Sequence, residues 1–201
     1  MFSEAVKKAI SSLSRLPGIG PRQAARISVY LARLSPARLE EFIDSVSGLK
    51  SVSVCPRCFF LNQTNGGSLC SICADSSRDS YTVAVVEKET DLISLEKSGR
   101  FRGRYLVIGD LRRSGEFEEW QHERLASFRR QIGELTSGGK FKEIILAINP
   151  TSFGDLGAVI LAREFSPLAE RLTRLGRGLP TGGEIEFADA DTLAAALDNR
   201  R

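Results

Sequence analysis

All four cysteines of the chain lie in one short stretch, and this feature constrains the fold more than any other. The stretch reads CPRCFFLNQTNGGSLCSIC, residues 55–73, and it contains two Cys-x-x-Cys pairs separated by eleven residues. Each pair places two thiols on one turn, and the flexible loop between the pairs allows the turns to face each other. The spacing therefore predicts a closed site of four thiolates, formed by Cys55, Cys58, Cys70 and Cys73.

The expected compartment bears on how these thiols are used. No apolar run approaches the roughly 20 residues that span a bilayer. The first residues, MFSEAVKKAISSLSRL, lack the continuous apolar segment of a secretory signal. We therefore expect a cytoplasmic protein without a membrane partner, in a reducing environment where structural disulfides are rare.

Four thiolates in a closed site are a common arrangement for structural zinc, so we expect one zinc ion per chain. Four protein ligands leave no coordination position open, which indicates a structural ion and not a catalytic one. An iron–sulfur cluster is the alternative that the same ligands allow. We expect the segment to fold only with its metal, because it has almost no hydrophobic core of its own.

The net charge of the chain, +3, is small but unevenly distributed. Residues 1–58 contain nine Lys and Arg against four Asp and Glu, a net charge of +5, and residues 59–201 have a net charge of −2. This pattern is typical of a basic module that meets phosphate, and also of an uneven solvated surface. Charge alone does not separate the two interpretations.

The basic part has the pattern of a small helical module. Apolar spacing predicts a helix over residues 4–16, a second helix from Pro21 and a third from Pro36 to near Gly48. Gly18 and Gly20 permit a tight turn between the first two helices. The expected core stripes of the second and third helices are Ile27, Tyr30, Leu31 and Leu34, and Leu39, Phe42, Ile43 and Val46.

Arg22 and Arg26 lie one turn apart at the start of the second helix, directly after the Gly-x-Gly turn. The free N–H groups of a helix N-terminus favour phosphate, and flanking arginines would add charge. Such contacts recognise the DNA backbone and not the base sequence. The alternative is a helical hairpin whose glycines only close the turn.

The rest of the chain alternates between strand and helix patterns. Apolar runs predict strands over residues 82–87, 104–109 and 143–149, and helices over 90–98, 116–135 and 154–165. This alternation favours an α/β domain with a mostly parallel sheet covered on both faces. The tail from residue 174 has a Gly/Pro turn, a short strand-like piece and a helix capped by Asp189 or Asp191.

Acidic and polar residues follow the predicted strands, at the edge where such sheets bind ligands. Glu87 follows the first strand, Asp110 the second, and Asp155 comes shortly after the third. Magnesium chemistry needs clustered carboxylates, but Asn149 and Thr151 stand where further acids would be required. We therefore expect no two-metal site here, and we expect His122, the only histidine, to be a solvated side chain.

The order of several motifs resembles the RecR family of bacterial recombinational-repair proteins. These motifs are LPGIGPRQAAR, CPRC…CSIC, VAVVEKETDLISLEKSGRFRGRYLVIG, ILAINPT and GLPTGGEIEFADADTLAAAL. The resemblance implies a helix-hairpin-helix module over 1–52, a zinc motif over 53–78, a Toprim-like domain over 79–170 and a C-terminal segment over 171–201.

The resemblance also implies a function. Proteins of this family form dimers or tetrameric rings and work with RecO and RecF at single-strand gaps, where they help RecA load onto DNA. By position, Arg22 and Arg26, with Gly18 and Gly20, would face DNA, and the four cysteines would bind zinc. Glu87 would be the Toprim glutamate, serving partner and subunit contacts and not cleavage.

This chain departs from the family pattern at three places. Phe153-Gly154-Asp155 stands where the family usually has Glu-Gly-Glu, Arg177 stands where His is usual, and residues 110–124 replace a Gly/Pro-rich segment. All three places fall near the carboxyl edge of the predicted sheet.

The sequence supports a non-enzymatic DNA-binding clamp best. The alternative is a magnesium-dependent Toprim enzyme, such as a primase, nuclease or topoisomerase-like protein. A third reading is a protein-binding adaptor with little DNA affinity of its own.

Overall fold

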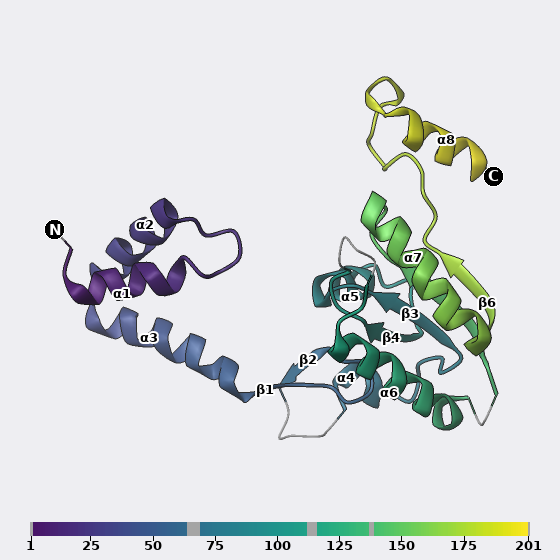
Figure 1. Cartoon of the computed structure of the whole chain (residues 1–201), viewed down its shortest axis with the longest axis horizontal. Coiled ribbons are helices and arrows are strands. Elements are labelled where there is room, and N and C mark those ends of the chain that lie inside the picture. The colour runs from purple at the N-terminus through teal and green to yellow at the C-terminus, as the bar shows by residue number, and fades with distance from the viewer. Residues whose placement is uncertain (1, 64–68, 112–115, 137–138, 201) are drawn as a thin grey trace. The chain divides into compact units, whose positions relative to one another are not determined.

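The structure is a computed structural model, and it describes residues 2–63, 69–111, 116–136 and 139–200. The chain forms two compact units, Met1–Val52 and Ser53–Arg201 (Figure 1). Within the described ranges, no helix is long and apolar enough to cross a membrane.

The first unit is helical, as the sequence predicts. It contains α1 (Glu4–Leu13), α2 (Pro21–Ala32), α3 (Pro36–Ser47) and the 3-10 turn η1 (Gly48–Ser51). Local signals set these bounds. The Ser3 hydroxyl accepts a hydrogen bond from the Val6 amide, and a proline begins both α2 and α3.

The predicted apolar stripes of α2 and α3 are covered only in part. Four of their residues are half-buried, namely Ile27, Leu31, Leu34 and Leu39. The other four are exposed by 44% to 64%, namely Tyr30, Phe42, Ile43 and Val46. The buried positions of α2 are instead the small residues Ala24 and Ser28. Small side chains permit close helix contact, and a unit of three short helices has too little interior to bury every apolar stripe.

The second unit is built on a parallel sheet, which confirms the predicted α/β class. Its strands run in the order β4-β3-β5-β6. Val85 of β3 lies opposite Leu106 on one side and Leu146 on the other. The strands are β3 (Thr82–Val86), β4 (Arg104–Val107), β5 (Phe141–Ala147) and β6 (Ala169–Arg174).

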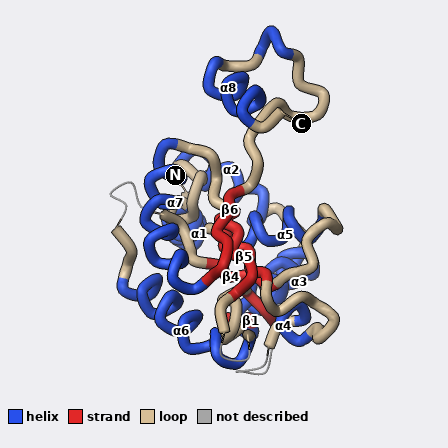
Figure 2. The backbone as a smooth tube through the Cα atoms, turned by 90° about the vertical axis from the view of Figure 1, so that its right-hand side faces the viewer, coloured by secondary structure: helices blue, strands red, loops and turns tan. Residues whose placement is uncertain are grey.

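Helices and the cysteine segment cover the two faces of this sheet. In Figure 2 the strands form one band, with α6 and α7 on one side and α5 on the other. The helices are α5 (Glu89–Lys97), α6 (Glu119–Leu135) and α7 (Ser152–Phe165). The cysteine segment contributes β1 (Val52–Val54), β2 (Leu61–Gln63) and α4 (Ser71–Ala74).

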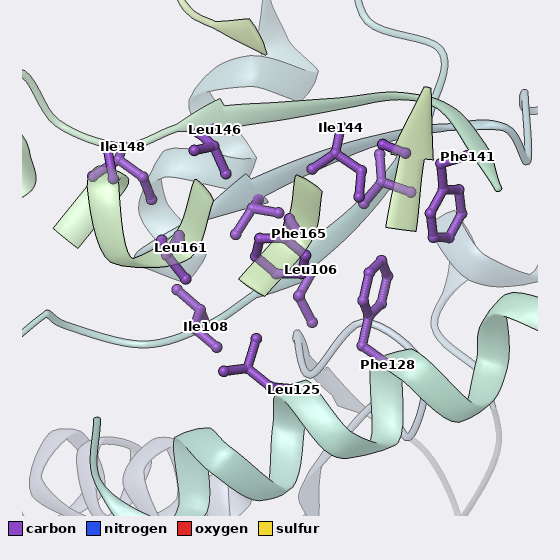
Figure 3. Close-up of a cluster of buried hydrophobic side chains, with 14 residues drawn as sticks. Leu106, Ile108, Leu125, Phe128, Phe141, Ile144, Leu146, Ile148, Leu161 and Phe165 are labelled. Carbon is purple, nitrogen blue, oxygen red and sulfur yellow. The ribbon is translucent and has the colours of Figure 1, made fainter. Parts of the chain in front are cut away.

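Alternate residues of the strands supply the two cores. Figure 3 shows the larger core, where Phe128 of α6 stacks on Phe141 with ring centroids 5.3 Å apart and meets Phe165 of α7 edge to face. On the other face Ala84, Val86, Tyr105 and Val107 pack with α5 and the four cysteines. The cysteine segment is therefore part of the second core and not a separate knot.

Two features of the C-terminal part differ from the sequence expectation. The strand β6 was not predicted, because AERLTR has few apolar residues; as an edge strand it pairs only with β5. The expected strand-like piece near residue 185 is a 3-10 turn, η3 (Ile185–Phe187). A second such turn, η2 (Ser166–Leu168), precedes β6.

The last helix, α8 (Ala190–Asp198), begins as the sequence indicates. Asp189 is its N-cap, and the Asp189 carboxylate accepts a hydrogen bond of 2.8 Å from the Thr192 amide. This choice between the two acids proposed from the sequence follows from the position of Asp189 directly before the first helical residue.

Candidate functional site

The four cysteine sulfurs converge on one point. They lie within 4.8 Å of one another, and all four residues are buried. A tetrahedral zinc ion with Zn–S bonds of about 2.3 Å would hold its sulfurs about 3.8 Å apart. Cys58 Sγ and Cys70 Sγ are 3.5 Å apart, too far for a disulfide and suitable for a shared metal ion. The donor set therefore fits a metal ion.

Backbone hydrogen bonds shape the first cysteine turn. The Phe59 amide donates to the Cys55 carbonyl at 3.0 Å, and the Cys55 amide donates to the Phe60 carbonyl at 2.8 Å. Phe59 has a φ of 62°, in the left-handed region that closes such a turn. This turn thus presents both of its sulfurs to the same side.

The second turn is joined to the first through a sulfur atom. The Cys70 amide donates to Cys55 Sγ at 3.4 Å, and the Ala74 amide closes the turn by donating to the Cys70 carbonyl. Gly66 and Gly67, which belong to the flexible loop between the two pairs, lie outside the described residues.

The electrostatics of the cluster favour a cation. Hydrogen bonds from the Cys58, Cys70 and Cys73 thiols hold the pKa of Cys55 well below its usual range. The hydrogen bond to Cys55 raises the pKa of Cys58 above its usual range. The pKa of Cys70 is also lowered, to about 7, so part of the cluster ionises beside protonated neighbours. Ionising all four thiols together requires a positive ion among them.

The candidate phosphate-binding residues lie on the exposed start of α2. Arg22 and Arg26 are both exposed and occupy one helix face, one turn apart. Gly20 precedes the helix in extended conformation and provides no side-chain cap for its first N–H groups. Gly18 has a φ of 76°, a conformation that favours glycine, and open space surrounds it.

The three acids at the carboxyl edge of the sheet each have another partner. Glu87 is 9% exposed, and its Oε1 accepts hydrogen bonds from the Asn149 amide at 3.0 Å and from Asn149 Nδ2 at 3.3 Å. Asp110 pairs with Lys88 Nζ at 3.1 Å. Within the described ranges, the cysteine cluster is the only group of three or more potential ligands that could hold a metal ion.

Asp155 pairs with arginines from the chain that follows α7. Arg174 Nη2 donates to it at 2.8 Å, and Arg177 also binds it through both terminal nitrogens. These hydrogen bonds, first from Arg177 and then from Arg174, lower the pKa of Asp155. Asp155 and Arg177, which belong to two separate departures from the family pattern, are therefore contact partners.

The third departure, residues 110–124, lies beside the same edge. The Trp120 ring covers Gly109, where an added Cβ would lie 2.0 Å from the ring, and the Leu111 side chain lies over Gly157. His122 is exposed on α6 and meets Phe117 edge to face. Residues 112–115 of this segment lie outside the described residues.

Comparisons with known proteins agree with this architecture. The family model described as Toprim domain matches residues 81–176, and the model described as RecR, C-terminal, matches residues 178–201. Both matches fall in the second unit.

Relatives named "Recombination protein RecR" match the chain over nearly its full length. The protein of Roseiflexus castenholzii is 38% identical over 98% of this chain and 93% of its own length. The protein of Chloroflexus aggregans is 37% identical over 100% of this chain and 95% of its own, and that of Frankia alni is 37% identical over 100% and 98%. Identity at this level, spread over both units and with the cysteine cluster formed, shows that the chain belongs to the RecR family of recombination proteins.

Proposed function

We propose that this chain is a non-enzymatic mediator of recombinational repair that binds DNA through its first unit. In this proposal it forms an oligomeric clamp, a dimer or a tetrameric ring, in the cytoplasm at the nucleoid. With RecO- and RecF-type partners it helps to load RecA recombinase at single-strand gaps. Family membership supports the repair role, and the exposed arginine pair beside the open N-terminus of α2 supports the DNA contact.

The two arginines act with the backbone in this proposal. Unpaired N–H groups at the start of α2 and the guanidinium groups of Arg22 and Arg26 would meet one phosphate region of the DNA. Gly18 and Gly20 keep side chains away from the approaching backbone. Each contact is weak alone, and a ring that presents several copies would multiply them by avidity.

The second part of the proposal is a structural zinc ion held by Cys55, Cys58, Cys70 and Cys73, one per chain. The supporting observation is the burial and convergence of the four sulfurs. The metal would fix the two cysteine turns against the sheet and so give the chain a rigid segment directly after the DNA-binding unit.

The competing magnesium-dependent enzyme would need free, convergent acids. Glu87 is held by Asn149, and Asp155 is neutralised by Arg174 and Arg177. We propose that Glu87 supports a partner or subunit surface instead. Nicking of supercoiled DNA, or nucleotide polymerisation, that requires magnesium and disappears in Glu87→Ala would establish the enzyme.

The DNA-binding proposal is tested by fluorescence anisotropy with a gapped duplex at several salt concentrations. Arg22→Ala/Arg26→Ala should weaken binding and reduce the slope of log affinity against log salt by about 2, because each phosphate contact contributes about 0.9. Lys97→Ala/Arg100→Ala removes the same charge from exposed positions at the end of α5 and is the matched control.

Equal binding by the arginine variant and the wild type would refute the assignment of α2. Absence of binding by the wild type would contradict DNA binding by the chain alone. A pull-down with a RecO-type protein would then test the adaptor reading.

A further inference from the structure

A buried arginine of the sheet lies beneath the second cysteine turn. Arg104, the first residue of β4, is 6% exposed. Its Nη1 donates to the Ile72 carbonyl at 2.9 Å and to the Cys73 carbonyl at 3.1 Å. Its Nη2 lies 3.5 Å from the Ser80 hydroxyl. One guanidinium group thus binds two backbone carbonyls of the Cys70–Cys73 turn.

The charge of Arg104 has no ion-pair partner in contact with it in the described part of the chain. Asp75 and Asp79 interact with it only at longer range, and its buried Nε has no hydrogen-bond partner. Burying a cation without a counter-ion is costly. The cysteine cluster, once its thiols have ionised, would place a strongly anionic group at the turn that Arg104 binds.

The same strand also holds the first cysteine turn. The Val107 amide of β4 donates to the Cys58 carbonyl at 2.9 Å. β4 is an edge strand of the sheet, so this amide faces away from β3. Arg57 adds a third connection, with Nη1 donating to the Cys73 carbonyl at 3.4 Å. Both turns are therefore anchored on one strand, and two guanidinium groups meet at the Cys73 carbonyl.

Charge balance gives these arginines a role. Four thiolates around a divalent ion carry a net charge of −2, which is unfavourable in a buried site unless cations lie close. We propose that Arg104 is a positioning residue of the metal centre. It fixes the second cysteine turn through two carbonyls and supplies the buried positive charge that the loaded tetrathiolate requires. This inference rests on the proposed structural metal and adds the residue that prepares its site.

The inference links metal occupancy to the sheet. When the metal is bound, Arg104 has its counter-ion and β4 is covered by both turns. When the metal is removed, the tetrathiolate is no longer held together and Arg104 keeps only its longer-range interactions with Asp75 and Asp79. The edge of the sheet at β4 should then loosen, while β5 and β6 on the far side should not.

The test measures metal release and the spectrum of the loaded site. Zinc-loaded wild type, Arg104→Met and Arg104→Lys are exposed to a chromogenic chelator, and each protein is also loaded with Co²⁺. Arg104→Met should release zinc about 10- to 100-fold faster, the usual effect of removing a group that orients metal ligands. Its thiolate-to-cobalt band should move to longer wavelength, because the thiolates have lost a nearby cation.

Arg104→Lys keeps the charge but cannot span both carbonyls. Its cobalt band should lie at the wild-type wavelength, because the positive charge is kept. Its zinc release should be slower than that of Arg104→Met but still faster than that of the wild type. Arg102→Met is the matched control, since Arg102 is exposed two residues earlier in the same segment. It should behave as the wild type in both measurements.

Each outcome bears on one claim. A folded Arg104→Met with wild-type release rate and cobalt band would overturn the inference and leave the proposed zinc site intact. Wild type that folds without metal and binds neither zinc nor cobalt would overturn the zinc proposal itself. If Arg104→Met does not fold, the cobalt band and zinc release rate of Arg104→Lys test the inference. Wild-type zinc release in Arg104→Lys would contradict the role of the two carbonyl hydrogen bonds, because lysine cannot make both of them.

Discussion

The cysteine cluster and the carboxyl edge of the sheet both gather groups that can bind cations, yet they differ in what surrounds those groups. At the cluster four sulfurs face one point. The neighbouring guanidinium groups of Arg57 and Arg104 bind backbone carbonyls and leave the sulfur atoms free to bind a metal ion. At the edge each acid is already engaged: Glu87 by Asn149, Asp110 by Lys88 and Asp155 by two arginines.

The difference shows that acidic residues at one edge do not by themselves form a metal site. A cation must find donors that are close together and uncompensated. The cysteine turns meet that condition through local hydrogen bonds within a few residues. Glu87 and Asp110 follow separate strands, Asp155 lies in the first turn of α7, and each of the three is engaged by another side chain.

Removing one sulfur should have the largest effect. Cys70→Ser leaves three thiolates and disrupts a site whose metal supplies folding free energy, about 10–16 kcal/mol in isolated zinc-finger peptides. We expect zinc content well below one per chain and rapid proteolysis within residues 53–78, measured by elemental analysis and mass spectrometry.

Ser71→Ala, an exposed change in the same turn, should leave both readings as in the wild type. Full zinc content and normal protease resistance in Cys70→Ser would show that the cluster does not need all four sulfurs. The cysteine cluster would then differ less from the carboxyl edge of the sheet than proposed.

The cysteine cluster and three of the four strands of the parallel sheet could be predicted because their signals are local. Two Cys-x-x-Cys pairs specify their own turns, and apolar runs such as TVAVV are typical of strands buried on both faces. Strand β6 has no such signal, because its sequence AERLTR mixes charged and apolar residues, as is usual for a strand at the edge of a sheet.

The contacts between distant residues could not be predicted. Asp155 meets Arg177 only because β6, which was missed, returns the chain to the same edge. Arg104 and Arg102 look alike in FRGRYLVIG, and only the register of β4 buries one and exposes the other. The exposed half of the apolar stripes of α2 and α3 was not predicted for the same reason: helical spacing marks an apolar face but does not identify what covers it.

The edge should be more sensitive to steric change than to loss of charge. Gly154 lies in the first turn of α7 against Asn149, and an added Cβ would lie 1.9 Å from the Asn149 carbonyl oxygen. Gly154→Ala should therefore displace Asn149, weaken its hold on Glu87 and destabilise the protein by about 1–3 kcal/mol in urea denaturation, as overpacking does.

Gly133 is the matched control, because it lies in α6 with open space around it. Gly133→Ala should stabilise the protein by about 0.5–1 kcal/mol. Zinc content should be unchanged in both variants. Loss of zinc in Gly154→Ala would mean that the edge and the cluster are one cooperative site and not two independent ones.

The smallest expected effect concerns the arginines around Asp155. The ion pairs are exposed, so Arg177→Ala should cost no more than about 1 kcal/mol. The pKa of Asp155 is lowered in the folded protein, so its stabilising effect is complete above the ordinary carboxyl pKa of about 3.9 and is lost as the pH falls through the lowered value. Stability curves of wild type and Arg177→Ala should converge in that acidic range.

The double variant Arg174→Ala/Arg177→Ala tests the comparison most directly. It frees Asp155, but Glu87 keeps its hydrogen bonds to Asn149 and Asp110 keeps Lys88. Millimolar magnesium should therefore leave its melting temperature unchanged, as in the wild type. A magnesium-dependent rise confined to the double variant would mean that two arginines alone separate this edge from a metal site, and that the acids converge once the cations are removed.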